Sequence, residues 1–242
     1  MLILRLLGPF DARLNDAPLP RLYSRKGQWL LALLVHRHDR EVDRSWLAGT
    51  LWRDAEEARA LFYLRRELAS LRLSLGSEAD RLTSPKPRTL RLNVDGADID
   101  VLAFDAAAAA RDEPALEQAA ALYSGPLLEG CGEEWVAPER EAREQALLNV
   151  LETLAARKMA RHEYARAESH LRAVIAIDPL RESAHRALMQ ALASQGANAA
   201  AVECYRSLRI HLHAELNATP DAETSALFNA IRGKAQSCVE SK

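Results

Sequence analysis

The feature that most limits the fold of this 242-residue chain is a self-similarity at a spacing of 34 residues in its second half. The matching positions are apolar or small, and they pair Leu154 with Leu188, Ala155 with Met189, Ala167 with Ala201, and Leu171 with Tyr205. Thirty-four residues is a period of stacked helical hairpins. An ordinary helical bundle can give apolar coincidences at one shift. However, the punctuation by Pro179 and Pro220 favours a helical repeat, which presents a protein-facing groove rather than a catalytic pocket.

The first 95 residues follow a different pattern. Two short strands, Ile3–Leu7 and Phe10–Leu14, are separated by Gly8-Pro9. Ser24 can cap a helix from Arg25 to about His36, and Asp43 can cap a second helix from Arg44 to about Trp52. A third helix is predicted from Asp54 or Ala55 to Leu75, with Gly76 as a left-handed cap.

The third predicted helix has two distinct faces. Leucines spaced by three and four form one buried seam, and they are Leu61, Leu64, Leu68, Leu71 and Leu75. The opposite face is cationic and partly aromatic, with Arg59, Phe62, Tyr63, Arg66, Ser70 and Leu73 outward and Arg65 and Arg72 on the flanks. A solvated helix face would show the same spacing.

The elements that follow favour a DNA-binding interpretation of this face. Arg81–Thr83 and Arg88–Leu92 alternate as a pair of strands around a basic tip that contains Lys86. Three helices followed by a basic hairpin are typical of a winged helix-turn-helix, whose third helix enters the major groove, where base edges accept hydrogen bonds from arginine.

Charge divides the chain in the same way. Residues 1–95 hold 17 Arg and Lys against 12 Asp and Glu, which gives 17 − 12 = +5, whereas residues 96–242 hold 15 against 22, which gives 15 − 22 = −7. The total of −2 argues against a uniformly basic nucleic-acid coat. It predicts instead a DNA-facing first part and an acidic helical second part.

Over about residues 2–232 the chain resembles transcriptional activators of the antibiotic-regulatory-protein type, in which an OmpR-like winged helix precedes a bacterial transcriptional activator domain. The most specific match is the segment from Asp178 to Met189 (DPLRESAHRALM). Ala121 to Gly130 (ALYSGPLLEG) resembles the opening of that domain, and Leu6 to Phe10 (LLGPF) resembles the start of the winged helix. The predicted fold is therefore mainly α, with a winged helix-turn-helix over 1–96 and an all-α, tetratricopeptide-like domain over 97–242.

The resemblance implies sequence-specific binding to double-stranded promoter DNA and recruitment of RNA polymerase. Candidate DNA contacts are Lys26, Arg44, Trp46, Arg59, Arg65, Arg66, Ser70, Arg72, Lys86 and Arg88. Candidate polymerase contacts are Arg53, Asp54, Glu56 and Glu57. A homodimer, arranged head to tail, would suit direct-repeat operators.

An alternative stays open, because Ala69, Ser70 and Leu73 stand where recognition helices of that family often carry basic residues. The chain would then be a repeat-based adaptor or ligand-sensing module with weak or no DNA binding, and the sequence leaves open whether it is part of a larger regulator.

Other chemistry finds little support in the sequence. There is no GxxxxGK[ST] loop, and no catalytic or metal-ligand set, so we predict neither an enzyme nor a cofactor nor a metal. The longest apolar run, Leu30–Val35, is too short to span a bilayer. Cys131, Cys204 and Cys238 are far apart and odd in number, which indicates reduced thiols and a cytoplasmic protein.

Overall fold

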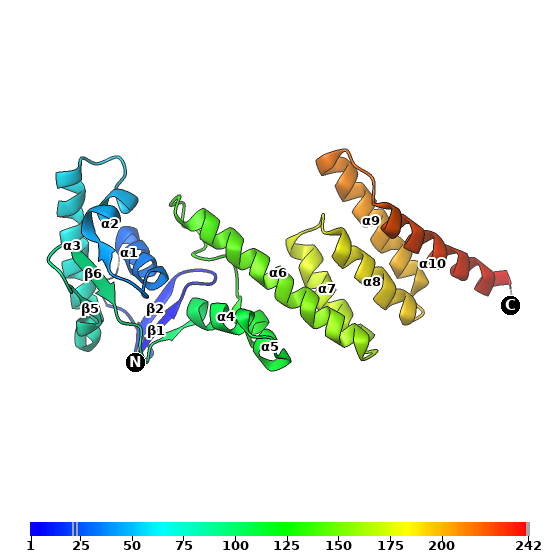
Figure 1. Cartoon of the computed structure of the whole chain (residues 1–242), viewed down its shortest axis with the longest axis horizontal. Helices are drawn as coiled ribbons and strands as arrows, with labels where there is room; N and C mark the ends of the chain where they lie inside the picture. The colour runs from blue at the N-terminus through cyan, green and yellow to red at the C-terminus, as the bar shows by residue number, and fades with distance from the viewer. Residues whose placement is uncertain (21, 23, 241–242) are drawn as a thin grey trace. The chain divides into compact units, whose positions relative to one another are not determined.

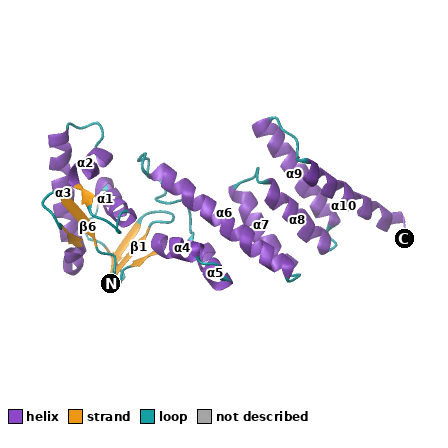
Figure 2. Ribbon diagram, in the orientation of Figure 1, coloured by secondary structure: helices purple, strands orange, loops and turns teal. Residues whose placement is uncertain are grey.

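The computed structural model describes residues 1–20, 22 and 24–240, and the side chains among them up to residue 233. Two compact units emerge from the packing of the chain. The first contains residues 1–109 and 121–144, and the second contains residues 110–120 and 145 onward. Figure 1 shows the elements along the chain, and Figure 2 shows that the strands belong to the first unit while helices make up the second.

A four-stranded sheet opens the first unit. Its strands are β1 (Leu2–Arg5), β2 (Asp11–Leu14), β3 (Ala17–Pro18) and β7 (Asp98–Ile99), in the order β3-β2-β1-β7. β1 pairs with β2 antiparallel and with β7 parallel. This order places β7, which follows the predicted hairpin in the sequence, beside the N-terminal strand β1.

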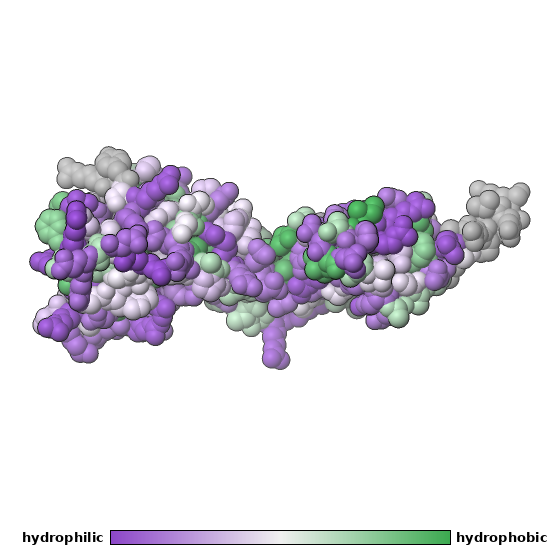
Figure 3. Space-filling model, turned by 90° about the horizontal axis from the view of Figure 1, so that it is seen from above, coloured by the Kyte–Doolittle hydropathy of each residue, from purple (hydrophilic) through white to green (hydrophobic). Residues whose placement is uncertain are grey.

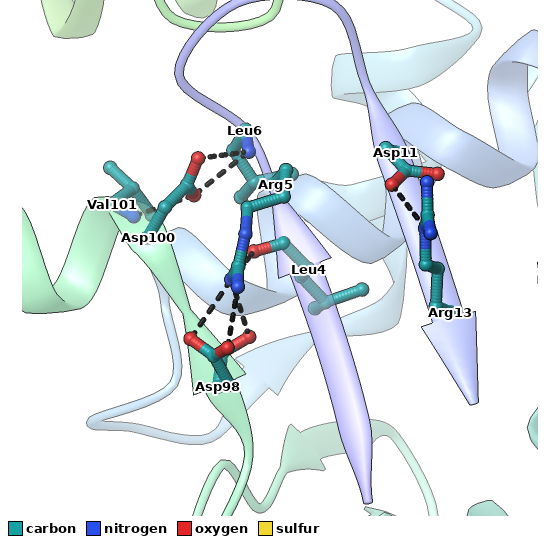
Figure 4. A network of polar contacts seen from close by, with 8 residues as sticks. All are labelled: Leu4, Arg5, Leu6, Asp11, Arg13, Asp98, Asp100 and Val101. Carbon is teal, nitrogen blue, oxygen red and sulfur yellow. Dashed lines mark hydrogen bonds and ion pairs between the residues drawn. The ribbon is translucent and has the colours of Figure 1, made fainter. Parts of the chain in front are cut away.

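Polar contacts hold β7 against β1 (Figure 4). The Arg5 guanidinium donates from Nη1 to Asp98 Oδ1 at 2.9 Å, and the Asp100 carboxylate accepts from the backbone N–H groups of Leu6, Leu7 and Val101. Burial raises the pKa of Asp100 despite these three donors. Asp100 therefore fixes both the end of β1 and the first turn of α4 (Asp100–Ala109).

Three helices and a small second sheet form the predicted winged helix-turn-helix. α1 (Arg25–His36) begins after Ser24, whose hydroxyl accepts from the Gly27 N–H, and α2 (Arg44–Leu51) begins after Asp43, which accepts from Ser45 and Trp46. α3 (Glu57–Leu75) packs against both helices. The strands β4 (Val42–Asp43), β5 (Leu82–Thr83) and β6 (Thr89–Leu92) pair in the order β4-β6-β5, so the expected hairpin is confirmed.

The structure corrects the predicted bounds of the third helix. It begins at Glu57 rather than at Asp54 or Ala55, because the preceding residues form a turn in which the Ala55 N–H donates to the Trp52 carbonyl. Gly76 has a φ of 53° but a ψ of −116°, and it continues into a 3₁₀ helix, η1 (Gly76–Arg81), instead of forming a left-handed cap. Leu61 is only half-buried, and Ala60 takes its place in the seam.

The segment around Gly125 docks on the end of β1. Leu128 N donates to Leu6 O at 2.7 Å, and Gly8 N donates to Pro126 O at 3.1 Å. A Cβ on Gly125 would lie 3.2 Å from Gly8 Cα, so the two backbones approach too closely for a larger residue. Residues 121–144 therefore pack with the first unit, whereas the sequence-based division at 96/97 stays a prediction about domains.

The second unit is built from helices with the predicted period. It contains most of α5 (Glu113–Leu122) and the part of α6 (Val136–Ala160) from residue 145 onward. These are followed by α7 (Tyr164–Ile177), α8 (Glu182–Ser194), α9 (Asn198–Leu216) and α10 (Ala222–Glu240). α7 packs on α8, α8 on α9, and α9 on α10 (Figure 1). α7 and α9 start 198 − 164 = 34 residues apart, and Ala167 and Ala201 are fully buried.

Buried charge in the second unit is paired. We name as the lysine cluster Lys158, Arg161, Glu113 and Glu117. The Lys158 ammonium lies 2.5 Å from Glu113 and 3.0 Å from Glu117, and Arg161 lies 2.7 Å from Glu113. These contacts hold the pKa of Glu113 below its usual value, chiefly through the hydrogen bond from Lys158.

Most of the face seen in Figure 3 is hydrophilic, with separate hydrophobic patches. Large apolar side chains that are exposed include Trp46, Phe62 and Leu73 in the first unit and Ile210 and Leu216 in the second. Cys131 and Cys204 carry free thiols, while the Cys238 side chain lies outside the described residues. Among the described helices, none combines the length and the apolar character needed to cross a membrane.

Candidate nucleic-acid interface

The outward face of α3 is exposed as its periodicity predicts. Leu64, Leu68, Leu71 and Leu75 are buried, because each turn of the helix returns them to the core of the first unit. On the opposite side Phe62 and Leu73 are 58% and 64% exposed, and the Arg66 side chain is 66% exposed. A helix with this exposure has a free surface for a partner molecule.

Three arginines on one side of this face form an uncompensated positive group, which we name the arginine cluster: Arg44, Arg65 and Arg72. Partial burial lowers the pKa of Arg44, and repulsion from Arg72 and Arg65 lowers it further. None of the three forms an ion pair with a carboxylate of the described residues. A cation that neighbouring cations repel is stabilised when an anion binds to it.

Arg44 also joins the cluster to the hairpin. Its Nη2 donates to Ser84 Oγ at 2.9 Å, and its backbone N–H donates to the Arg88 carbonyl at 2.9 Å. The Arg44 Nε is buried and has no hydrogen-bond partner among the described residues. The start of α2, the flank of α3 and the hairpin tip therefore lie together.

At the hairpin tip, two basic residues differ in their surroundings. Lys86 lies 3.2 Å from Glu41, whose carboxylate also accepts from Thr89 at 3.0 Å. Arg88 is exposed, and its side chain forms no ion pair within the described part of the chain. Arg88 is thus the freer cation of the tip.

An aromatic group lies at the N-terminal end of α3. Arg59 Nε donates to the Tyr63 hydroxyl at 2.6 Å, and the Arg59 and Arg66 guanidinium groups lie 5.7 and 5.8 Å from the Tyr63 ring centroid. The rings of Phe62 and Trp52 are each 6.0 Å from that of Tyr63. Tyr63 orients two of the predicted contact arginines, which the i, i+4 and i, i+3 spacings could have indicated.

Two other predicted residues, Ser70 and Trp46, are less exposed than the Arg66 side chain. Ser70 is half-buried, and its carbonyl accepts from Ser74 Oγ at 3.0 Å. Trp46 is 42% exposed, with the Arg37 guanidinium 5.1 Å from its ring centroid. Arg37 was not among the residues predicted from the sequence, since nothing local links it to Trp46.

Lys26 lines a second cleft of about 580 Å³ together with three of the predicted polymerase contacts and with Arg59 and Tyr63 of α3. Lys26 donates to the Leu51 carbonyl and lies 2.7 Å from Glu133, while Arg53 pairs with Glu134. Asp54 and Glu56 line the same cleft, and Glu57 is exposed at the start of α3. The roles of Glu133 and Glu134 carry no local sequence signal, because their partners are 107 and 134 − 53 = 81 residues away.

Comparison with known proteins assigns the chain to a family. Residues 98–232 match the family described as the bacterial transcriptional activator domain. A solved structure of Mycobacterium tuberculosis EmbR in complex with a low affinity phosphopeptide is similar in fold, with a TM-score of 0.77, 23% sequence identity and coverage of 96% of this chain. The chain spans 65% of that EmbR chain, and none of the curated proteins matches it. The resemblance seen in the sequence is confirmed, and the chain belongs to the bacterial transcriptional activator domain family.

Proposed function

We propose that this protein is a sequence-specific, DNA-binding transcriptional activator that recruits RNA polymerase to promoters. The observation that carries the proposal is the arginine cluster, in which Arg65 and Arg72 repel Arg44 and none of the three forms an ion pair with a carboxylate of the described residues. Backbone phosphates supply the anions that such a cluster lacks. Family membership places the chain in transcription regulation, which agrees with this chemistry.

The exposed face of α3 suits the major groove. Arg66 and Arg59, oriented on Tyr63, would reach base edges together with Ser70, because guanidinium groups donate to the acceptors of guanine. Arg44, Arg65 and Arg72 would hold phosphates, Lys86 and Arg88 would do so at the hairpin tip, and Trp46 would contact the backbone. Lys26 supports the proposal least, because Glu133 already neutralises its ammonium.

The exposed segment 53–57 is our candidate surface for RNA polymerase. It joins α2 to α3 and carries Asp54, Glu56 and Glu57 toward solvent. A small contact surface is sufficient for recruitment, since about 1.4 kcal/mol of favourable contact free energy changes polymerase occupancy about tenfold. Transcription in vitro from a selected site should therefore fall when Asp54, Glu56 and Glu57 are replaced together by Ala while DNA affinity is retained. Unchanged transcription would remove this surface from the proposal.

Selection of bound sites from random DNA tests DNA binding and specificity together. The purified chain should enrich one sequence, and that sequence should bind more tightly than random DNA of equal length. Arg72→Ala should weaken this binding, and Arg172→Ala, an exposed arginine of α7 paired with Glu168, should not. If no sequence is enriched, the adaptor or ligand-sensing alternative is favoured.

Enriched direct repeats would support two protomers arranged head to tail. Footprinting and sizing of the complex then measure how many chains bind one operator. One protomer on one half-site would contradict the homodimer.

A further inference from the structure

A cavity of about 330 Å³ lies within the first unit, and none of the residues assigned to DNA lines it. Its apolar walls come from the end of β1, from α1, from α4 and from the docked segment, and they include Leu6, Ala32, Val101 and Leu128. All four side chains are nearly fully buried. A volume near 300 Å³ is at the lower end of the range for pockets that hold small molecules.

Three hydrogen-bond donors on the wall of this cavity are buried without a partner among the described residues. They are Arg37 Nε, Trp135 Nε1 and Arg143 Nε. Buried donors in folded proteins are almost always paired, so three unpaired ones around one cavity point to a ligand with acceptor oxygens. Arg143 is the most buried of these charged side chains, with 8% of its surface exposed.

The rest of the Arg143 guanidinium is firmly held. Its Nη2 donates to Asp105 Oδ2 at 2.7 Å, and its Nη1 donates to Glu139 Oε2 at 3.0 Å. Glu139 also lies 2.9 Å from His36 Nε2, although burial lowers the pKa of His36. Fixed in this way, the Arg143 Nε is a preorganised donor, and two carboxylates offset the charge of its guanidinium.

Arg37 is a cation of the cavity wall without a carboxylate partner among the described residues. It stacks over Trp46, 5.1 Å from the ring centroid. A positive group beside an apolar cavity favours a ligand with one negative charge and an apolar body.

We propose that this cavity binds a small, mainly apolar carboxylic acid, whose carboxylate accepts hydrogen bonds from Arg37, Trp135 and Arg143. None of the residues assigned to DNA lines the cavity, although Arg37 contacts one of them, Trp46, so binding of the acid can be tested without DNA.

The indole N–H of Trp135 makes the proposal directly testable in the full chain. The sequence has four tryptophans, so a ¹H–¹⁵N spectrum contains four indole signals, and single Trp→Phe variants assign them. The probe is 3-phenylpropanoate, compared with 3-phenylpropanamide and 3-phenylpropylamine as neutral and cationic analogues. We expect a saturable downfield shift of the Trp135 signal with the carboxylate, a weaker one with the amide, and none with the amine.

Two variants and a control locate the site. Trp135→Phe keeps an aromatic ring but removes the donor, and it should weaken 3-phenylpropanoate binding about tenfold. Trp52→Phe, the same change in the other cleft, should leave the Kd unchanged. Ala32→Leu fills the cavity and should abolish binding while the far-UV circular dichroism of the folded chain is retained.

Three outcomes overturn the proposal. They are no saturable shift of the Trp135 signal with 3-phenylpropanoate, equal binding of the amine, and binding that survives Ala32→Leu. If Trp135→Phe fails to fold, Ala32→Leu and the three probes still test whether the cavity binds a carboxylate.

Discussion

The arginine cluster and the lysine cluster place positive charge in opposite environments. Arg65 and Arg72 repel Arg44, whereas Lys158 and Arg161 are held by Glu113 and Glu117. The first arrangement leaves electrostatic energy to be gained from an external anion, and the second has already gained it inside the fold. The contrast teaches that the number of cations says little about DNA binding, whereas the distribution of carboxylates around them says much.

The largest effect on DNA binding is expected when two members of the arginine cluster are replaced. Arg65→Ala with Arg72→Ala should reduce affinity for all DNA on the order of 100-fold, because a hydrogen bond to a charged group contributes about 1.5–3 kcal/mol. The slope of log K against log salt should also become shallower by about two. Fluorescence anisotropy at several salt concentrations measures both quantities.

The same double variant should not lower the Tm, because it relieves repulsion on Arg44. Lys158→Ala in the second unit is the matched control, and it should lower the Tm and leave DNA affinity unchanged. A loss of Tm in the double variant as large as that in Lys158→Ala would contradict the distinction between the two clusters.

A smaller and more selective loss is expected at Arg66. Arg66→Ala should weaken binding to the selected site by about 1–3 kcal/mol and relax specificity at one base pair, because a base contact is lost while the phosphate contacts remain. Competition between the selected site and single-base variants of it provides the measurement. An equal loss for all sequences would reassign Arg66 to phosphate binding.

A change at the hairpin tip should have a still smaller effect. Arg88→Ala should weaken binding to every sequence by a similar factor and reduce the salt slope by about one, because one phosphate contact disappears. Lys86→Ala, whose ammonium is shared with Glu41, is expected to change affinity less. A larger loss of DNA affinity for Lys86→Ala than for Arg88→Ala would show that the ion pair with Glu41 does not reduce the contribution of Lys86 to DNA binding.

Much of the fold follows from local sequence signals. Ser24 and Asp43 cap helices as predicted, because their side chains accept from backbone N–H groups within three residues. The leucine seam of α3 and the 34-residue shift were also predicted, since burial repeats with the period of the helix. The start of α3 was misplaced because a turn at Trp52–Ala55 competes with helix in acidic, alanine-rich sequence.

The site was less predictable from the sequence, because its chemistry depends on distant residues. Which cation is free and which is paired depends on carboxylates such as Glu133, which lies 107 residues from Lys26. The orientation of Arg59 and Arg66 on Tyr63 follows helical spacing and could have been predicted. The docking of Gly125 on Gly8, which assigns residues 121–144 to the first unit, required the three-dimensional structure.

The subtlest prediction concerns the pH dependence of the lysine cluster. Hydrogen bonds from Lys158 and Arg161 lower the pKa of Glu113 in the folded chain. The ionised carboxylate therefore stabilises the fold at pH values above the ordinary glutamate pKa of about 4.3. That stability is lost as the pH falls through the lowered pKa. Glu113→Gln should therefore lower the Tm of the second unit at pH 7, and the difference in Tm from the wild type should shrink toward zero as the pH falls below about 4.

All four tryptophans lie in the first unit. A change in circular dichroism that is not accompanied by a change in Trp fluorescence therefore reports unfolding of the second unit. Glu215→Gln, which removes an exposed carboxylate of α9, is the control, and a constant difference for Glu113→Gln across this range would contradict the assignment.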